Sequence, residues 1–160
     1  MPNDLRRLPF ALDDVDRALL AELARDARIP NNALAAKVGI APSTCLGRVR
    51  ALRARGVIRG YHADVDPAAV GSPLQAMIAI RLAVHSRDQI DAFVATASRL
   101  RGVLSIFHVA GTTDYLLHVA FPGAEELRDF VLSQLTAHPA VLHAETSLIF
   151  DHTKGRGLLS

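Results

Sequence analysis

The amino-acid sequence predicts an α+β fold, in which an N-terminal winged helix-turn-helix precedes a C-terminal ferredoxin-like βαββαβ domain. Two observations lead to this fold class. Apolar residues recur at helical spacing in the first third of the chain, whereas segments of alternating polarity follow in the second half. Residues 67–74 lie between them, contain a glycine and a proline, and are typical of a hinge. We therefore expect domains at residues 1–66 and 75–152, with a flexible tail at residues 153–160.

Three helices are expected in the first domain. Leucine and valine recur at helical spacing over residues 12–25, and aspartates occupy the first turn, where the helix dipole favours anions. A second, short helix is expected to begin at Asn31 or Asn32, which are both good N-cap residues. Pro42 suits the first turn of a helix and begins the third one, which Gly56 ends.

A β-ribbon is expected after the third helix. Residues 57–65 predict two short strands, or one strand bent around Gly60, and Asp66-Pro67 predicts a turn. Three helices with a tight turn between the second and third, followed by such a ribbon, describe a winged helix-turn-helix.

The second domain is expected to contain four strands and two helices in the order β-α-β-β-α-β. Ser86 and Gln89 form a capping box that opens the first helix, and His138-Pro139 ends the second. The strands are expected at residues 75–84, 103–110, 115–121 and 141–150. One face of this sheet lacks helices, and Met77 and Ala79 are among the apolar residues expected there. A second copy is the simplest cover for that face, so we expect at least a homodimer.

Composition excludes several classes of protein. Half of the residues are hydrophobic and 21% are charged, so the chain should bury a core rather than stay disordered. A single cysteine excludes an intrachain disulfide framework and suits a reducing, cytoplasmic location. The N-terminus has no long apolar run, which argues against a secretory signal. The longest uncharged stretch, residues 130–144, contains polar residues and is too short to span a bilayer, so no membrane association is expected.

Charge is unevenly distributed along the chain. Residues 27–63 contain seven bases and no acid, although the net charge is only +2. Such a basic segment is typical of a surface that binds nucleic acid. An exposed arginine-rich helix without a ligand is the alternative interpretation.

The first domain contains the runs LDDVD, RIPNNALAAKVGI and TCLGRVRAL, and the second contains GTTDYLLHV and ETSLIF. Together, in this order and at these separations, they resemble the leucine-responsive regulator/asparagine regulator (Lrp/AsnC) family of bacterial and archaeal transcription factors. The resemblance covers about residues 12–150. It implies a DNA-binding domain, dimers that often assemble into octamers or similar rings, and an amino acid or related metabolite as effector. In the family, the effector usually lies where neighbouring dimers meet.

The third helix supplies the candidate DNA-binding residues, because a recognition helix presents its N-terminal part to base edges. The residues expected on this face are Pro42, Ser43, Thr44, Gly47, Arg48 and Ala51. Arg48 matches the arginine of the family's T-C-L-x-R motif and is expected on phosphate or guanine. Arg50 and Arg53 are expected on phosphates, and Arg59 at the tip of the wing. Cys45 is expected in the core.

The turn at residues 111–115 is the candidate effector site. The residues expected in this site are Gly111, Thr112, Thr113, Asp114 and Tyr115. Thr146 is added to them, because it resembles a threonine that the family keeps near its pocket. Asp114 could accept from an α-ammonium group, and the two threonines could bind a carboxylate. From the residues alone, an ordinary hairpin turn, in which Asp114 bonds nearby backbone amides, is the preferred interpretation. The resemblance favours the pocket, although the family commonly has an acid-aromatic pair in place of Thr112-Thr113.

These features predict a sequence-specific DNA-binding transcription regulator that an amino acid or related small metabolite modulates. No cofactor is expected, and no metal site, since His108 and His118 are only two ligands. An enzyme is not expected, because no nucleophile–base pair or phosphate loop is evident. Two alternatives stay open: an architectural protein that wraps DNA without an effector, and an amino-acid-sensing partner of an enzyme.

Overall fold

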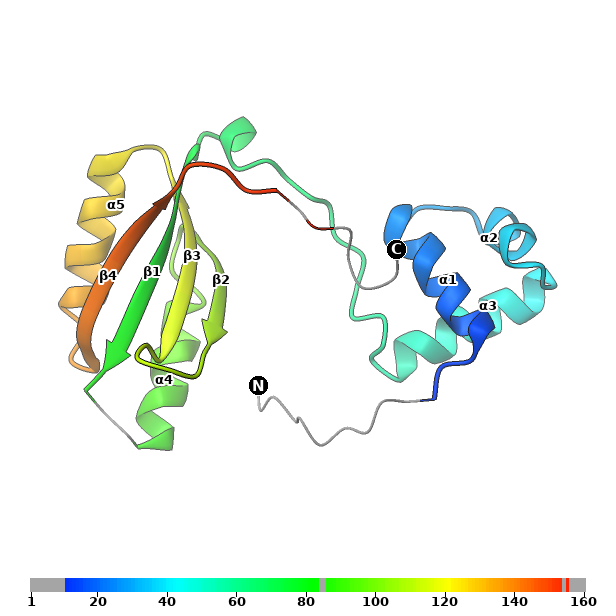
Figure 1. Cartoon of the computed structure of the whole chain (residues 1–160), viewed down its shortest axis with the longest axis horizontal. Coiled ribbons are helices and arrows are strands. Elements are labelled where there is room, and N and C mark those ends of the chain that lie inside the picture. Colours follow the sequence, from blue (N-terminus) through cyan, green and yellow to red (C-terminus); the bar gives the residue numbers. More distant parts are fainter. Residues whose placement is uncertain (1–10, 84–85, 154, 156–160) are drawn as a thin grey trace. The chain divides into compact units, whose positions relative to one another are not determined.

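The computed structural model describes residues 11–83, 86–153 and 155, and the chain divides into two compact units (Figure 1). The division falls between Ala63 and Asp64. The domain limits expected from the sequence stay predictions. The predicted tail, residues 153–160, lies almost wholly outside the described residues.

The first unit contains three helices, α1 (Asp14–Arg25), α2 (Asn31–Val38) and α3 (Pro42–Ala54). They confirm the predicted helix-turn-helix. The core of this unit consists of side chains that are at most 3% exposed, namely Leu19, Leu34, Ala35 and Cys45. Each helix therefore buries the apolar side that its periodicity predicted, and turns its other side to solvent.

The turn between α2 and α3 is held by a side chain. Pro30 is the N-cap of α2 and makes no side-chain cap bond, so the prediction that Asn31 or Asn32 caps this helix is wrong. Asn31 instead donates from Nδ2 to the carbonyl oxygen of Pro42 at 2.9 Å. Gly39 ends α2 with φ 74°, in the left-handed region where a glycine meets no Cβ penalty.

The predicted wing strands do not form. Residues 57–65 are all described and contain no strand, so the predicted β-ribbon is wrong. From Arg59 onward these residues are exposed, and none of residues 57–65 belongs to the described hydrophobic cores. Short extended segments without a packed face are marginal in water, which explains why the two halves do not pair. Tyr61 lies beside α3 instead, with its ring centroid 5.7 Å from the Arg53 guanidinium carbon.

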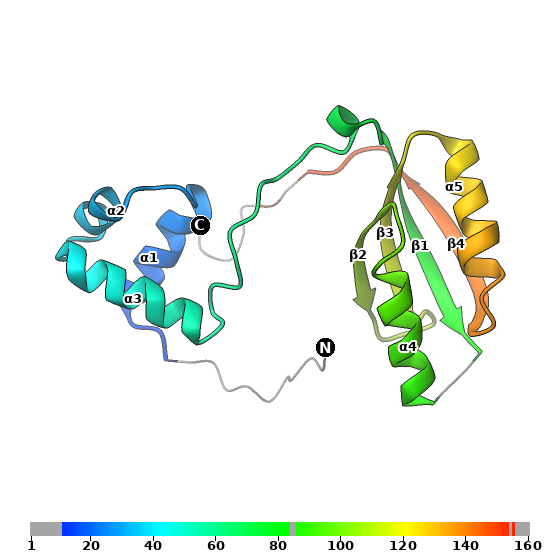
Figure 2. The same cartoon turned by 180° about the vertical axis from the view of Figure 1, so that it is seen from behind.

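The second unit is a four-stranded antiparallel sheet in the order β2-β3-β1-β4, as the predicted βαββαβ arrangement requires. Its elements in chain order are η1 (Ala68–Val70), β1 (Leu74–Leu82), α4 (Arg87–Ala97), β2 (Val103–His108), β3 (Tyr115–Phe121), α5 (Ala124–Phe130), η2 (Val131–Thr136) and β4 (Val141–Ile149). Helices α4 and α5 cover the same face of this sheet (Figures 1 and 2). Ser86 caps α4 by accepting from the Gln89 amide at 3.5 Å, as predicted.

The core of this unit lies between the sheet and the helices. Every second residue of β1 and β3 is buried there, including Ile78, Ile80, Leu117 and Val119. The second helix differs from the expected single α-helix, because α5 continues directly into a π-helical segment, η2.

The opposite face of the sheet carries no helix. Register places Met77 beside His118 and Ala79 beside Leu116, and it places Leu116 beside Phe107 on its other side. Phe107 is 49% exposed, and the other apolar residues of this face are half-buried. We call Met77, Ala79, Phe107, Leu116 and His118 the open sheet face. Within the described residues, none of the helices has both the length and the apolar character that a bilayer crossing requires.

Candidate nucleic-acid interface and effector site

Helix α3 presents a continuous exposed surface. Cys45 and Leu52 point into the core, and Val49 packs against it. The exposed residues of the helix include Pro42, Ser43, Thr44, Leu46, Gly47, Arg50, Ala51 and Arg53. The predicted base-reading residues therefore lie together on one side, with the exception of Arg48.

Gly47 leaves space on this surface. A Cβ placed on Gly47 would meet no heavy atom within 4 Å apart from its own helix and neighbours. Nothing in the fold thus requires a glycine here. The missing side chain lets the backbone of α3 approach a ligand closely.

Arg48 is bound to two carboxylates of α1. Its Nη1 donates to Asp13 Oδ2 at 2.6 Å and to Asp16 Oδ1 at 2.9 Å. Asp16 is 7% exposed, and a buried carboxylate requires such a partner. Arg48 therefore fixes α3 against the start of α1, and its predicted contact with DNA stays a prediction.

The sequence explained the aspartates at the start of α1 by the helix dipole, and it did not predict that Asp13 and Asp16 bind Arg48. Asp13 is also the N-cap of α1, since Oδ1 accepts from the Asp16 amide at 2.7 Å. That hydrogen bond, and after it the bond from Arg48, holds the pKa of Asp13 below its usual value. The hydrogen bonds that Arg48 donates to Asp13 and, after it, to Asp16 raise the pKa of Arg48, so the guanidinium stays charged.

The remaining bases of the acid-free segment differ in their partners. Lys37 pairs with Glu22 at 2.7 Å. Within the described part of the chain, Arg50 and Arg59 make no ion pair within 4.0 Å. Their charges are thus available to an anion such as a phosphate. Leu46 is 41% exposed on the same helix, and the sequence analysis did not single it out.

The turn at residues 111–115 lies where β2 passes into β3. Gly111 has φ 131°, which a side chain would disfavour. Asp114 binds the end of β1, because its Oδ2 accepts from the Leu82 amide at 2.8 Å and its amide donates to the Ile80 carbonyl at 2.9 Å. The hairpin-turn interpretation has Asp114 bonding nearby backbone amides, whereas here its carboxylate bonds the amide of Leu82 on the neighbouring strand β1.

Tyr115 follows the turn as the first residue of β3. It is buried, and its ring stacks on His108 with centroids 4.8 Å apart. Burial, and after it the charges of Asp91 and Asp114, raises the pKa of Tyr115, so the phenol keeps its proton. Gly111 and Thr112 are exposed at the outer side, and Thr113 is half-buried.

Thr146 is not brought to this turn within one chain. It lies on β4 opposite Ile78, and β1 separates β4 from β3. His118 lies on the open sheet face and forms a hydrogen bond between Nε2 and Gln75 Oε1 at 2.9 Å. Burial, and after it His152, lowers the pKa of His118. No group of three or more potential metal ligands occurs among the described residues.

Comparison with known proteins covers both units. Residues 75–159 match the Lrp/AsnC ligand binding domain, and residues 12–53 match the AsnC-type helix-turn-helix domain. The chain belongs to the Lrp/AsnC family. The resemblance that the sequence motifs carried is thereby confirmed.

Relatives in this family are transcriptional regulators. The HTH-type transcriptional regulator AldR of Mycobacterium tuberculosis is 52% identical over 92% of this chain and 82% of its own length. The leucine-responsive regulatory protein of Escherichia coli is 32% identical over 96% of this chain and 94% of its own. The chain is therefore a transcriptional regulator of the Lrp/AsnC family, and not an enzyme, in agreement with the sequence.

Solved structures of the family share the fold. The crystal structure of MtbAldR superposes with a TM-score of 0.80 at 48% identity and covers 92% of this chain and 98% of its own. A transcriptional regulator from Neisseria meningitidis, solved as a complex with L-Met, gives a TM-score of 0.83 at 33% identity. It covers 90% of this chain and 93% of its own.

Proposed function

We propose that this regulator binds specific DNA sequences through the exposed side of α3, and that an amino acid or related small metabolite modulates its DNA binding or assembly. The observation that carries the DNA-binding part is the side of α3 that holds Ser43, Thr44, Gly47 and Arg50. It is exposed, basic and free of acids along its length. A helix of this kind fits the major groove.

The residues divide by role. Pro42, Ser43, Thr44 and Gly47 lie toward the N-terminal part of α3, where base edges are read, and Leu46 can contact a thymine methyl group. Arg50, Arg53 and Arg59 are exposed and are assigned to phosphate contacts. Such contacts position the protein on the DNA without reading its sequence. Arg48 acts mainly by orienting α3, through Asp13 and Asp16.

Fluorescence anisotropy at several salt concentrations tests this proposal. The probes are the DNA upstream of the protein's own coding region and a scrambled duplex of equal composition. Arg50→Gln is expected to weaken binding to both duplexes and to reduce the salt slope by about 1. Arg87→Gln, which removes an exposed arginine of α4, is the matched control and should bind like the wild type.

Ser43→Ala combined with Thr44→Ala is expected to reduce the preference for the upstream DNA over the scrambled duplex. Absence of any binding would contradict the proposal. Equal affinity of the wild type for both duplexes would favour the architectural DNA-wrapping alternative.

The effector part rests on the ligand-binding domain and on the L-Met complex of the Neisseria regulator. We assign the site to Gly111, Thr112, Thr113, Asp114 and Tyr115, completed by Thr146 of a neighbouring copy, since one chain keeps Thr146 apart from the turn. Asp114 Oδ1 accepts no hydrogen bond among the described residues and can receive an ammonium group.

Repeating the anisotropy measurement with each common amino acid tests this assignment. Thr112→Val is expected to abolish the shift that the active amino acid causes while leaving DNA binding intact. Thr136→Val, on the exposed side of η2, is the control. A full response in Thr112→Val would contradict the assignment.

Self-association completes the proposal. The open sheet face is the surface that we assign to a homodimer, and dimers are expected to assemble further, to an octamer. The partners are thus double-stranded DNA, a small-molecule amino acid and further copies of the chain. No membrane is involved, and the site of action is the cytoplasm.

A further inference from the structure

We propose that the second unit contains a further ligand site that takes an α-amino acid with an apolar side chain. This site lies at the opposite end of β3 from the turn at residues 111–115. The turn adjoins Tyr115, whereas the cavity adjoins Phe121, the last residue of that strand. The inference does not depend on the DNA binding proposed above.

The cavity has a volume of about 500 Å³, which is in the range of small-molecule sites. It opens where the ends of β3, α4 and the start of α5 meet. Two of its lining residues carry opposite charges. Arg101 precedes β2, and Glu126 lies in the first turn of α5. Ser72, at the end of the connection from η1 to β1, also lines it.

The two charges are available to a ligand. Among the described residues, neither Arg101 nor Glu126 makes an ion pair within 4.0 Å, with each other or with another group. A guanidinium group binds a carboxylate through two parallel hydrogen bonds, and a carboxylate accepts from an ammonium. A ligand that carries both groups on one carbon, an α-amino acid, matches this pair of charges.

Gly123 makes room for the acid. A Cβ on Gly123 would lie 3.1 Å from Glu126 Oε2, which is closer than side-chain contacts normally allow. The carboxylate of Glu126 therefore lies back over the start of α5, at the exposed rim of the cavity.

The floor of the cavity is apolar. Phe121 and Phe130 are buried, with ring centroids 4.9 Å apart, and Leu100 lies beside them. Gly102 allows this arrangement, because it has φ 90° and a Cβ there would lie 2.6 Å from Phe121 Cζ. An aliphatic or aromatic side chain of the ligand would bury its surface on these residues.

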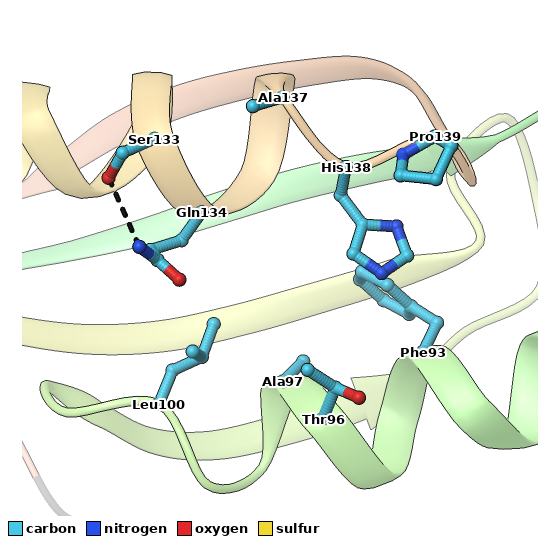
Figure 3. A pocket seen from close by; sticks show the side chains of 9 residues that line it. All are labelled: Phe93, Thr96, Ala97, Leu100, Ser133, Gln134, Ala137, His138 and Pro139. Carbon is cyan, nitrogen blue, oxygen red and sulfur yellow. Dashed lines mark hydrogen bonds between the residues drawn. The ribbon is translucent and has the colours of Figure 1, made fainter.

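The π-helical segment supplies a polar group at the rim. Gln134 of η2 lines this cavity and also a smaller one of about 210 Å³ between α4 and η2, and Leu100 lines both. Figure 3 shows Gln134 directed from η2 toward Leu100, with its Nε2 donating to Ser133 Oγ at 3.3 Å. Its Oε1 has no bond among the described residues and can accept from the ammonium group. π-helical turns are rare and frequently occur at functional sites.

The smaller cavity is the weaker candidate. No charged residue lines it, and His138 there is engaged, because Nδ1 accepts from the Ala140 amide at 3.2 Å. Its ring also packs edge-on against Phe93 at 5.3 Å. A zwitterion would lose its hydration there without gaining a charged partner.

Single-tryptophan reporters test the site, since the chain contains no tryptophan. Pro122→Trp places the reporter at the cavity, and Thr112→Trp places it at the other end of the sheet. Titration of the full chain with L-leucine, L-methionine and L-phenylalanine should change the fluorescence of Pro122→Trp for at least one of them. The analogues 4-methylpentanoate and 3-methylbutylamine, which lack the ammonium and the carboxylate of leucine, should bind at least tenfold more weakly.

Charge removal provides the decisive comparison. In the Pro122→Trp background, Arg101→Gln and Glu126→Gln should each weaken binding by about 10–100-fold. The controls Arg99→Gln and Glu125→Gln remove equal charges outside the cavity and should leave affinity unchanged. A response that either control removes equally, or that only Arg101→Gln removes, would overturn the proposal of an amino-acid site.

If Pro122→Trp fails to fold, equilibrium dialysis tests the site without a reporter. It measures the binding of labelled L-leucine, L-methionine and L-phenylalanine to the otherwise unchanged chain. One bound amino acid per chain should disappear in Arg101→Gln and persist in Arg99→Gln. Binding of none of the three, or a number of bound molecules per chain that Arg101→Gln leaves unchanged, would overturn the proposal. Thr112→Trp reports on the proposed effector site at residues 111–115. If this variant responds and Pro122→Trp does not, the second site is overturned.

Discussion

Arg48 joins α3 to the start of α1 across 32 and 35 positions of sequence. The ion pair is partly shielded from water, because Asp16 is buried and Arg48 is about one-third exposed. Removal of one partner leaves a carboxylate without compensation, which costs more than the net value of the pair. This residue thus couples the stability of the first unit to the orientation of its candidate recognition helix.

Arg48→Ala is expected to lower the free energy of unfolding of the first unit, because it leaves the buried carboxylate of Asp16 without its ion-pair partner. Arg50→Ala, on the exposed side of the same helix, should change it by less than about 0.5 kcal/mol. Urea unfolding followed by circular dichroism measures both. Equal stability of the two variants would show that the Asp13–Arg48–Asp16 contacts contribute nothing.

Acid should weaken the same contacts. The pKa of Asp13 is lowered in the folded state from its ordinary value of 3.8, so protons bind more readily to the unfolded chain. The stabilisation is complete above that ordinary value and is lost as the pH falls through it toward the lower folded-state pKa. Thermal unfolding at a series of pH values should show a smaller acid loss for Asp13→Asn than for the wild type. Asp14→Asn, one residue away, should keep the wild-type pH dependence.

At the scale of single elements, α3 combines a buried stripe with an unusual exposed glycine. Ala41 precedes the helix without a side-chain cap, and Pro42 reduces the number of unsatisfied amides at its start. The helix is held chiefly by Cys45, Leu52 and the Arg48 contacts. Its exposed side is therefore free to be selected for binding.

Gly47→Ala is expected to stabilise the first unit by about 1 kcal/mol, because glycine is a poor helix former and an alanine Cβ meets no neighbour there. Thermal unfolding measures this gain. If the backbone of α3 approaches DNA closely at Gly47, anisotropy should show weaker binding for the same variant. A variant that is more stable and binds DNA equally well would contradict the role of Gly47 in the interface.

The sequence predicted the elements that bury a periodic face. The three helices and the four strands lie within one or two residues of expectation wherever the expected ends are described, because apolar spacing directly reflects burial. The ribbon at residues 57–65 was wrong, since strand-like composition does not show whether a core is present to pack against. The π-helical segment has no periodic signature that distinguishes it from an α-helix over six residues.

The candidate site was predictable to a similar extent. Periodicity alone placed Ser43, Thr44 and Gly47 on the exposed side of α3. The engagement of Arg48 with Asp13 and Asp16, and of Asp114 with Leu82, depends on tertiary contacts that spacing does not reveal. The same is true of the cavity at Arg101 and Glu126, which adjacent elements form together.

At the scale of the whole molecule, the open sheet face is an apolar surface that a partner could cover. One side of the sheet is covered by α4 and α5, and the other carries exposed Phe107 together with half-buried Met77, Ala79 and Leu116. Apolar residues that follow each other across three strands favour a covered face. A two-fold pairing of two such faces covers both copies equally.

If the open sheet face forms the proposed dimer, Phe107→Glu is expected to yield a monomer in sedimentation equilibrium at micromolar concentration, because it places a charge in that face. Leu132→Glu introduces the same charge at an exposed leucine of η2 and should leave the dimer intact. A wild-type chain that sediments as a monomer would contradict the dimer itself.

Cys45 offers access to the motions of the first unit. It is the single cysteine of the chain, it is 0% exposed, and burial raises the pKa of its thiol. A thiol reagent can therefore reach it only during an opening of the three-helix core. The rate of labelling under native conditions reports the free energy of that opening separately from the second unit. Bound DNA would hold the unit closed by mass action, so slower labelling would measure DNA occupancy without a modified duplex.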